Sequence, residues 1–102
     1  MDYQTFYKVV RQMRKHLPIL YPIHVRRVRM PKGDDGDCEF KKDKFRIRIE
    51  KTLPENYAID VLLHELAHAL DWDSGEHSDD EHGPTWGEAY SAIYRHFLVI
   101  NQ

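Results

Sequence analysis

The chain has 102 residues, of which 41% are hydrophobic and 12% aromatic, and this length suits one domain with one core. Its single cysteine, Cys38, excludes an intrachain disulfide and a four-cysteine zinc ribbon. The first residues hold no apolar signal core, and no apolar run approaches transmembrane length. We therefore expect a single domain over residues 1–102 that is soluble, cytoplasmic, monomeric and free of membrane contact.

The net charge of −2 conceals a strong asymmetry along the chain. Residues 1–52 carry 14 Lys/Arg and 7 Asp/Glu, a net charge of +7, whereas residues 53–102 carry 1 and 10, a net charge of −9. A basic half can bind a polyanion, and it can equally attract the acidic half within the fold. The charges alone do not choose between these interpretations.

Residues 2–17 predict a first helix that ends at Pro18. Its apolar positions recur at helical spacing and form the stripe Phe6, Val9, Val10, Met13 and Leu17. The basic residues of this segment lie largely off that stripe. We expect a core-packing helix with a solvated basic face.

Residues 23–30, 38–41 and 44–50 read as three strands, and the last alternates most cleanly, with Phe45, Ile47 and Ile49 facing inward. Residues 31–37 are rich in Gly, Pro and Asp, which predicts a turn. The aspartates do not form a calcium-binding loop, because the EF-hand spacing is missing. Together these segments predict a small antiparallel three-stranded sheet with one wet, cationic face. If residues 44–50 form a sheet edge near the functional site, they would pair with an extended peptide.

The segment from Thr52 to Trp72 predicts the second helix. Thr52 and Glu55 have capping-box spacing, and the residues after Trp72 carry turn chemistry. Within this helix the run His64-Glu65-Leu66-Ala67-His68 is an H-E-x-x-H motif.

The motif predicts a zinc site because residues four apart lie on one face of a helix, where two imidazoles can reach one Zn²⁺. Glu65 projects to the side of His64, and there it need not bind the metal and can take a proton from the attacking water. Apolar residues occupy the opposite face of the helix, namely Ile59, Leu62, Leu63, Leu66 and Leu70.

Residues 73–83 form an acidic, polar loop, and a last helix begins near Pro84, with Thr85 and Glu88 at capping-box spacing. Its buried stripe is Trp86, Ala89, Tyr90, Ile93, Phe97 and Ile100. The predicted fold class is therefore α+β: an N-terminal helix, the small sheet, the H-E-x-x-H helix and a C-terminal helix.

A catalytic zinc needs a third protein ligand and an open position. The candidates after His68 are Asp71, Asp73, His77, His82 and Glu88. We favour His82, because it ends a loop long enough to double back and directly precedes a helix that would fix it. Imidazole also suits zinc well.

The motif His64-Glu65-Leu66-Ala67-His68, a short loop and then His82-Gly83-Pro84-Thr85-Trp86 together resemble the SprT-like zinc metalloprotease domain of the Spartan-related family. The resemblance covers essentially the whole chain and includes the order of the elements. It implies a zincin-like fold, zinc held by His64, His68 and His82, Glu65 as general base, and a peptidase that acts near DNA, since the family includes a DNA–protein crosslink protease. Trp86 stands where Phe is more usual, and with no cysteine-rich zinc ribbon the chain corresponds to a minimal form.

We therefore expect a hydrolase: a zinc metallopeptidase that cleaves a protein or peptide substrate, including DNA-associated proteins. The presence of Glu65 favours catalysis, because a purely structural zinc site has no need of that carboxylate. Two alternatives remain open, a nucleic-acid- or partner-binding module with a structural zinc and a regulatory protease that cleaves one repressor.

Two further expectations concern partners and chemistry. DNA contact would be carried by the cationic residues of the sheet region, namely Arg26, Arg27, Arg29, Lys41, Lys42, Lys44, Arg46 and Arg48. The candidates for stabilising the oxyanion are Tyr90, His77 and Tyr57.

Overall fold

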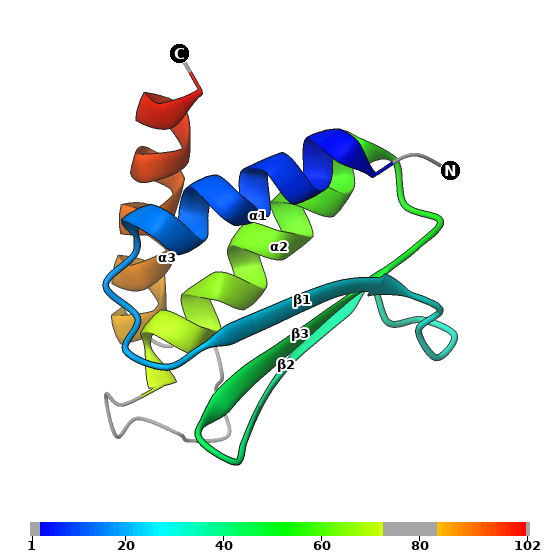
Figure 1. The fold of residues 1–102 in the computed structure, drawn as a ribbon, viewed down its shortest axis with the longest axis horizontal. Coiled ribbons are helices and arrows are strands. Elements are labelled where there is room, and N and C mark those ends of the chain that lie inside the picture. Colours follow the sequence, from blue (N-terminus) through cyan, green and yellow to red (C-terminus); the bar gives the residue numbers. More distant parts are fainter. Residues whose placement is uncertain (1–2, 73–83, 102) are drawn as a thin grey trace.

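The computed structural model describes residues 3–72 and 84–101 and has the predicted α+β order of elements (Figure 1). The elements are α1 (Gln4–His16), β1 (Ile23–Val28), β2 (Gly36–Lys41), β3 (Lys44–Glu50), α2 (Glu55–Leu70) and α3 (Pro84–Ile100). The three helices and three strands lie within a few residues of the segments predicted from the sequence.

The sheet is mixed, and the prediction of an antiparallel sheet is wrong in one of its two pairings. The strand order is β1-β3-β2, with β3 antiparallel to β2 but parallel to β1. A two-residue turn at Lys42 and Asp43, both with positive φ, makes β3 the immediate neighbour of β2. The central position buries the most apolar strand, since Phe45, Ile47 and Ile49 are each at most 1% exposed.

All three helices lie on one side of the sheet in Figure 1. Helix α2 is central, because it contacts β2, β3, α1 and α3. The stripe predicted for α1 is fully buried, and it joins the inner face of the sheet and the apolar face of α2 in one cluster. In the described part of the chain, none of the helices combines the length and the apolarity needed to cross a bilayer.

The outer face of the sheet is less cationic than its sequence suggests. Arg46 pairs with Glu39 across the β2–β3 ladder at 2.7 Å, and Arg48 pairs with Asp37 in the adjacent row. Arg27 does not belong to this surface at all, since its side chain is fully buried. The exposed cations of the predicted cluster are Arg26, Arg29, Lys41, Lys42 and Lys44, together with the paired Arg46. DNA contact through them stays a prediction.

Arg27 and Glu55 form a partly buried junction between α1, the end of β1 and the start of α2. Nη1 of Arg27 lies 2.9 Å from Oε1 of Glu55, and Nη2 donates to the carbonyl oxygens of Leu53 at 2.8 Å and Lys51 at 3.2 Å. The guanidinium carbon also lies 4.7 Å from the ring centroid of Phe6, a cation–π contact. The other Glu55 oxygen accepts the backbone N–H of Phe6 at 2.9 Å.

This junction explains why the capping box predicted at Thr52 and Glu55 is absent. Glu55 satisfies a free N–H in the first turn of α1 instead of folding back on Thr52, and α2 begins after Pro54 without a side-chain cap. Thr52 donates to the carboxylate of Glu50 through both its backbone N–H and its hydroxyl. The capping box predicted at Thr85 and Glu88 stays a prediction, because the residues directly before α3 lie outside the described part of the chain.

Replacing Arg27 with methionine should lower the free energy of unfolding by about 3 kcal/mol, because Glu55 and two carbonyl groups lose their buried partner. Urea denaturation of the purified variant measures this. The matched control is Arg26→Met at the neighbouring exposed position, which should change stability by about 0.5 kcal/mol or less. Equal losses of stability in the two variants would contradict the stabilising role of the Arg27–Glu55 junction.

The Glu50 carboxylate should make folding sensitive to acid. It accepts hydrogen bonds from the N–H of Met30 and from both donors of Thr52, and these lower its pKa from 4.5 to about 2. A depressed folded-state pKa adds stability above the unfolded value, and this stability is lost as the pH falls towards about 2. The difference in urea midpoint between the wild type and Glu50→Gln should therefore be largest near pH 7 and shrink between pH 4.5 and 2. A difference in urea midpoint that does not change with pH would contradict the lowered pKa of Glu50.

Candidate active site

The H-E-x-x-H motif lies in the C-terminal half of α2, as predicted. Strong helix formers fill the helix, which contains no internal Gly or Pro. Of the predicted apolar face, Ile59, Leu62, Leu63 and Leu66 are buried, while Leu70 is only partly buried. His64 and His68 are half-buried. The core anchors one side of the helix and leaves the two imidazoles accessible.

The two imidazoles of the motif lie against each other. Their ring centroids are 5.0 Å apart, and their planes meet at 71°. This proximity follows from the four-residue spacing on one helix face. Zinc binds imidazole nitrogen at about 2.0–2.1 Å, so two rings this close fit a single ion between them.

Trp86 of α3 packs against both histidines. Its ring centroid lies 5.0 Å from that of His64 and 5.6 Å from that of His68. Tyr90 stacks on Trp86 at 5.1 Å, with the planes 21° apart, and Tyr94 continues the row at 6.2 Å from Tyr90. The sequence predicted Trp86 on the buried stripe of α3. The structure shows that Trp86 also packs against the histidine face of α2.

Glu65 is only 7% exposed and lies on α2, which packs against β2 and β3. Its neighbour there is Cys38 of β2, which lies on the inner face of the sheet opposite Ile47. Burial, and then the charges of Glu65 and Asp37, raise the pKa of the Cys38 thiol to about 12. The thiol is therefore protonated at neutral pH. No pattern in the sequence predicts that Cys38 lies near the Glu65 carboxylate.

A groove of about 410 Å³ opens beside the motif and is walled by three separate segments. It is lined by Gly33, Asp34, Asp35, Gly36, Tyr57, Asp60, Val61, His64, Glu65 and Tyr90. Gly36 sets how close β2 comes to α2, because an added Cβ would lie 2.8 Å from Cγ1 of Val61 and 2.9 Å from the carbonyl oxygen of Arg48. A larger residue at position 36 would push the wall of the groove outward.

Two of the candidate oxyanion donors, Tyr57 and Tyr90, lie in this groove. The hydroxyl of Tyr57 donates to the carboxylate of Asp35 at 2.6 Å, and this hydrogen bond raises the pKa of Tyr57. The pKa of Tyr90 is raised mainly by burial and then by the charge of Asp60. Both hydroxyls therefore keep their protons at neutral pH, but the proton of Tyr57 is already engaged. The third candidate, His77, lies outside the described residues.

The third metal ligand falls outside what the structure describes. Within residues 3–72 and 84–101, no three His, Cys, Asp or Glu side chains gather closely enough to hold a metal ion. Asp71 and Glu88 therefore do not complete a site with His64 and His68. Asp73, His77 and the favoured ligand His82 all lie between residues 73 and 83, so the assignment of His82 stays a prediction.

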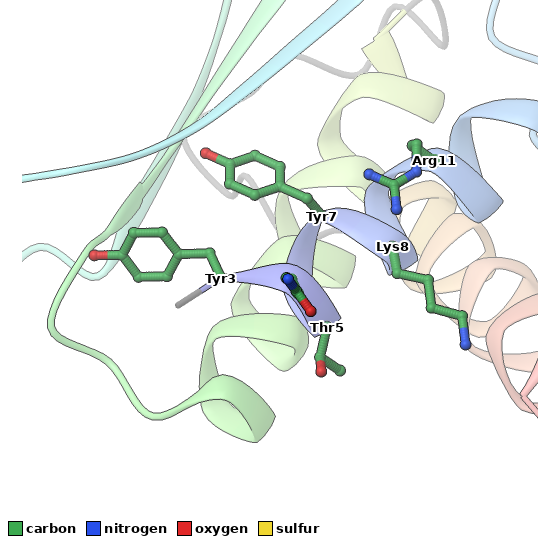
Figure 2. A pocket seen from close by; sticks show the side chains of 6 residues that line it. Tyr3, Thr5, Tyr7, Lys8 and Arg11 are labelled. Carbon is green, nitrogen blue, oxygen red and sulfur yellow. The ribbon is translucent and has the colours of Figure 1, made fainter. Parts of the chain in front are cut away.

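A second hollow, of about 620 Å³, lies over the first turns of α1 and is lined by Tyr3, Gln4, Thr5, Tyr7, Lys8 and Arg11 (Figure 2). Figure 2 shows Tyr3 and Tyr7 extending together to one side of the helix, with Lys8 and Arg11 on the other. Its lining holds none of the metal-ligating or acid–base groups of the motif. The groove beside His64 is the better candidate for chemistry.

A comparison with known protein families matches residues 6–101 to the SprT-like family. The chain belongs to the SprT-like family. The match spans every described element except the first two residues of α1 and confirms the resemblance drawn from the sequence. This family is associated with metallopeptidase-like function and typically with zinc. A comparison with curated proteins found no significant match.

Proposed function

We propose that this SprT-like protein is a zinc-dependent metallopeptidase that hydrolyses peptide bonds with Glu65 as general base. One observation carries the proposal: the imidazoles of His64 and His68 lie against each other on α2, and His64 and the buried Glu65 line an open groove. Membership of a family associated with metallopeptidase-like function supports it.

The donor set fits zinc. His64 and His68 offer two imidazole nitrogen ligands on one helix face, and His82 is the proposed third ligand. When bound, zinc supplies a Lewis acid that polarises a peptide carbonyl and makes a water molecule more acidic. Trp86 limits the movement of both imidazoles, since it packs against each ring.

Glu65 carries the proton transfer in this proposal. It follows His64 by one residue, so its carboxylate projects from an adjacent face of α2, beside the ligand pair and not within it. It also lines the groove in which a substrate would lie. There it takes a proton from the attacking water and delivers it to the leaving amine.

The peptide would add to the sheet along β2. Residues 44–50 do not meet the condition set for peptide pairing, because β3 is paired on both sides and is not a sheet edge. β2 is an edge strand that contacts α2, and its first residue, Gly36, lines the groove. Main-chain hydrogen bonds to the free edge of β2 would hold an extended substrate next to Glu65.

Tyr90 is the proposed donor to the oxyanion. It lines the groove with His64 and Glu65, and no hydrogen bond engages its hydroxyl proton in the way that Asp35 engages the proton of Tyr57 among the described residues. A donor aimed at the developing negative charge stabilises the tetrahedral state.

The proposal is tested by cleavage of a loosely folded DNA-binding protein, followed by gel electrophoresis with and without single-stranded DNA. The zinc-loaded wild type should cut, a chelator should stop it, and added zinc should restore it. Glu65→Gln should bind zinc and cut about 10²–10⁴-fold more slowly, because it cannot accept the proton. The matched control is Glu88→Gln on the exposed surface of α3, which should cut at the wild-type rate.

Zinc binding without cleavage by the wild type would contradict the proposal and favour a structural zinc in a binding module. Cleavage by Glu65→Gln at the wild-type rate would leave a peptidase but remove Glu65 from its chemistry. Dependence of cleavage on DNA would favour a role for the exposed cations of the sheet.

A further inference from the structure

Trp86 of α3 contacts three aromatic rings of the candidate site at once. Its ring centroid lies 5.0 Å from that of His64, 5.6 Å from that of His68 and 5.1 Å from that of Tyr90. These distances fall within the range of about 4.5–7 Å in which aromatic rings attract each other. The indole is therefore the common neighbour of two proposed zinc ligands and of the proposed oxyanion donor.

The same spacing on two helices produces this arrangement. Trp86 and Tyr90 are four residues apart on α3, just as the two histidines of the motif are on α2, so each pair lies on one face of its helix. Helix α3 contacts α2, and its residues Ala89 and Ile93 are buried in the common core. The backbone that carries the indole is thus fixed next to the histidine face of α2.

Contact with the indole restricts the movement of both imidazoles. A half-buried imidazole on a helix turns about its side-chain bonds, and a metal ion that binds two such rings has to order both of them. Packing against Trp86 supplies part of that order through protein contacts alone. Groups that orient metal ligands from outside the coordination shell change metal affinity by about 10–100-fold.

The indole also links the imidazoles to the groove. Tyr90 stacks on Trp86 with the ring planes 21° apart, and Tyr90 lines the groove together with His64. Because one ring contacts the histidines of α2 and the tyrosine of α3, a change in the position of either group alters the packing of the other. Such a coupling acts equally in both directions.

We propose that Trp86 is a positioning residue that orders His64 and His68 for zinc and couples them to Tyr90. This inference rests on the proposed zinc site, because it concerns the affinity of that site. It gives the indole no contact with the metal or with the substrate. Its consequence is that the ring of Tyr90, which binds no metal, contributes to zinc affinity.

The first test is zinc affinity, measured by competition with a chromophoric chelator. Trp86→Leu, which lacks an aromatic ring, should bind zinc about tenfold more weakly than the wild type, and Trp86→Phe should stay within about threefold of it. The matched control is Phe97→Leu, which removes a partly buried ring from the same helix and should keep the wild-type affinity. Circular dichroism of the zinc-free proteins checks that each variant is folded.

The second test leaves the indole intact. Tyr90→Leu should weaken zinc binding about threefold, whereas Tyr90→Phe, which keeps the ring, should bind zinc as tightly as the wild type. In the Trp86→Leu background, Tyr90→Leu should cause no further loss, because the link between the two rings is already broken. Independent, additive losses of affinity would contradict the coupling.

The outcomes separate this inference from the proposed function. Wild-type zinc affinity in Trp86→Leu, or an equal loss in Phe97→Leu, would overturn the positioning role whether or not the wild type cleaves peptides. The expected losses of affinity, in a wild type that binds zinc but cleaves nothing, would support the positioning role and count against the peptidase. A wild type that binds no zinc would overturn both.

Discussion

The ion pair between the buried Arg27 and the partly exposed Glu55 is the constraint on which the rest of the structure depends. It joins the first turn of α1, the end of β1 and the first residue of α2 at one point. Desolvation offsets much of the attraction in a buried ion pair, so we infer that its main effect is on geometry. The pair fixes the start of α2, and the motif follows about 14 Å further along the same rigid helix. His64, Glu65 and His68 are thereby held at a defined distance from β2 and from the aromatic row of α3.

Most of the fold could be predicted from the sequence, because local patterns determine most of it. The stripe of α1, the alternation of β3 and the uninterrupted helix formers of α2 identified those elements to within a few residues. The pairing of β1 could not be predicted, because a seven-residue link suits a hairpin as well as it suits a strand that leaves room for β3. Arg27 was equally ambiguous. Strict alternation from Ile23 and Val25 would turn Arg27 inward, whereas its charge suggests a surface position. The conflict is resolved only by Glu55, which arrives from a distant segment and pairs with it.

Part of the candidate site could likewise be predicted from the sequence, and part could not. The H-E-x-x-H spacing predicts two adjacent imidazoles from helix geometry alone, and the structure brings the two rings together. The groove could not be predicted, because its walls come from residues 33–36, from α2 and from Tyr90 of α3. Asp34 and Asp35 read as ordinary turn residues, and nothing in the sequence shows that they face Asp60 across a groove. The Cys38–Glu65 approach likewise depends on the register of β2.

The central claim is that His64, His68 and a third histidine hold a catalytic zinc. X-ray absorption at the zinc edge of the purified protein tests it most directly. The account predicts one zinc per chain with three imidazole ligands at about 2.0–2.1 Å, no sulfur ligand, and one imidazole fewer in His82→Ala. A sulfur ligand at about 2.3 Å, an unchanged spectrum in His82→Ala, or a protein that binds no zinc would contradict it.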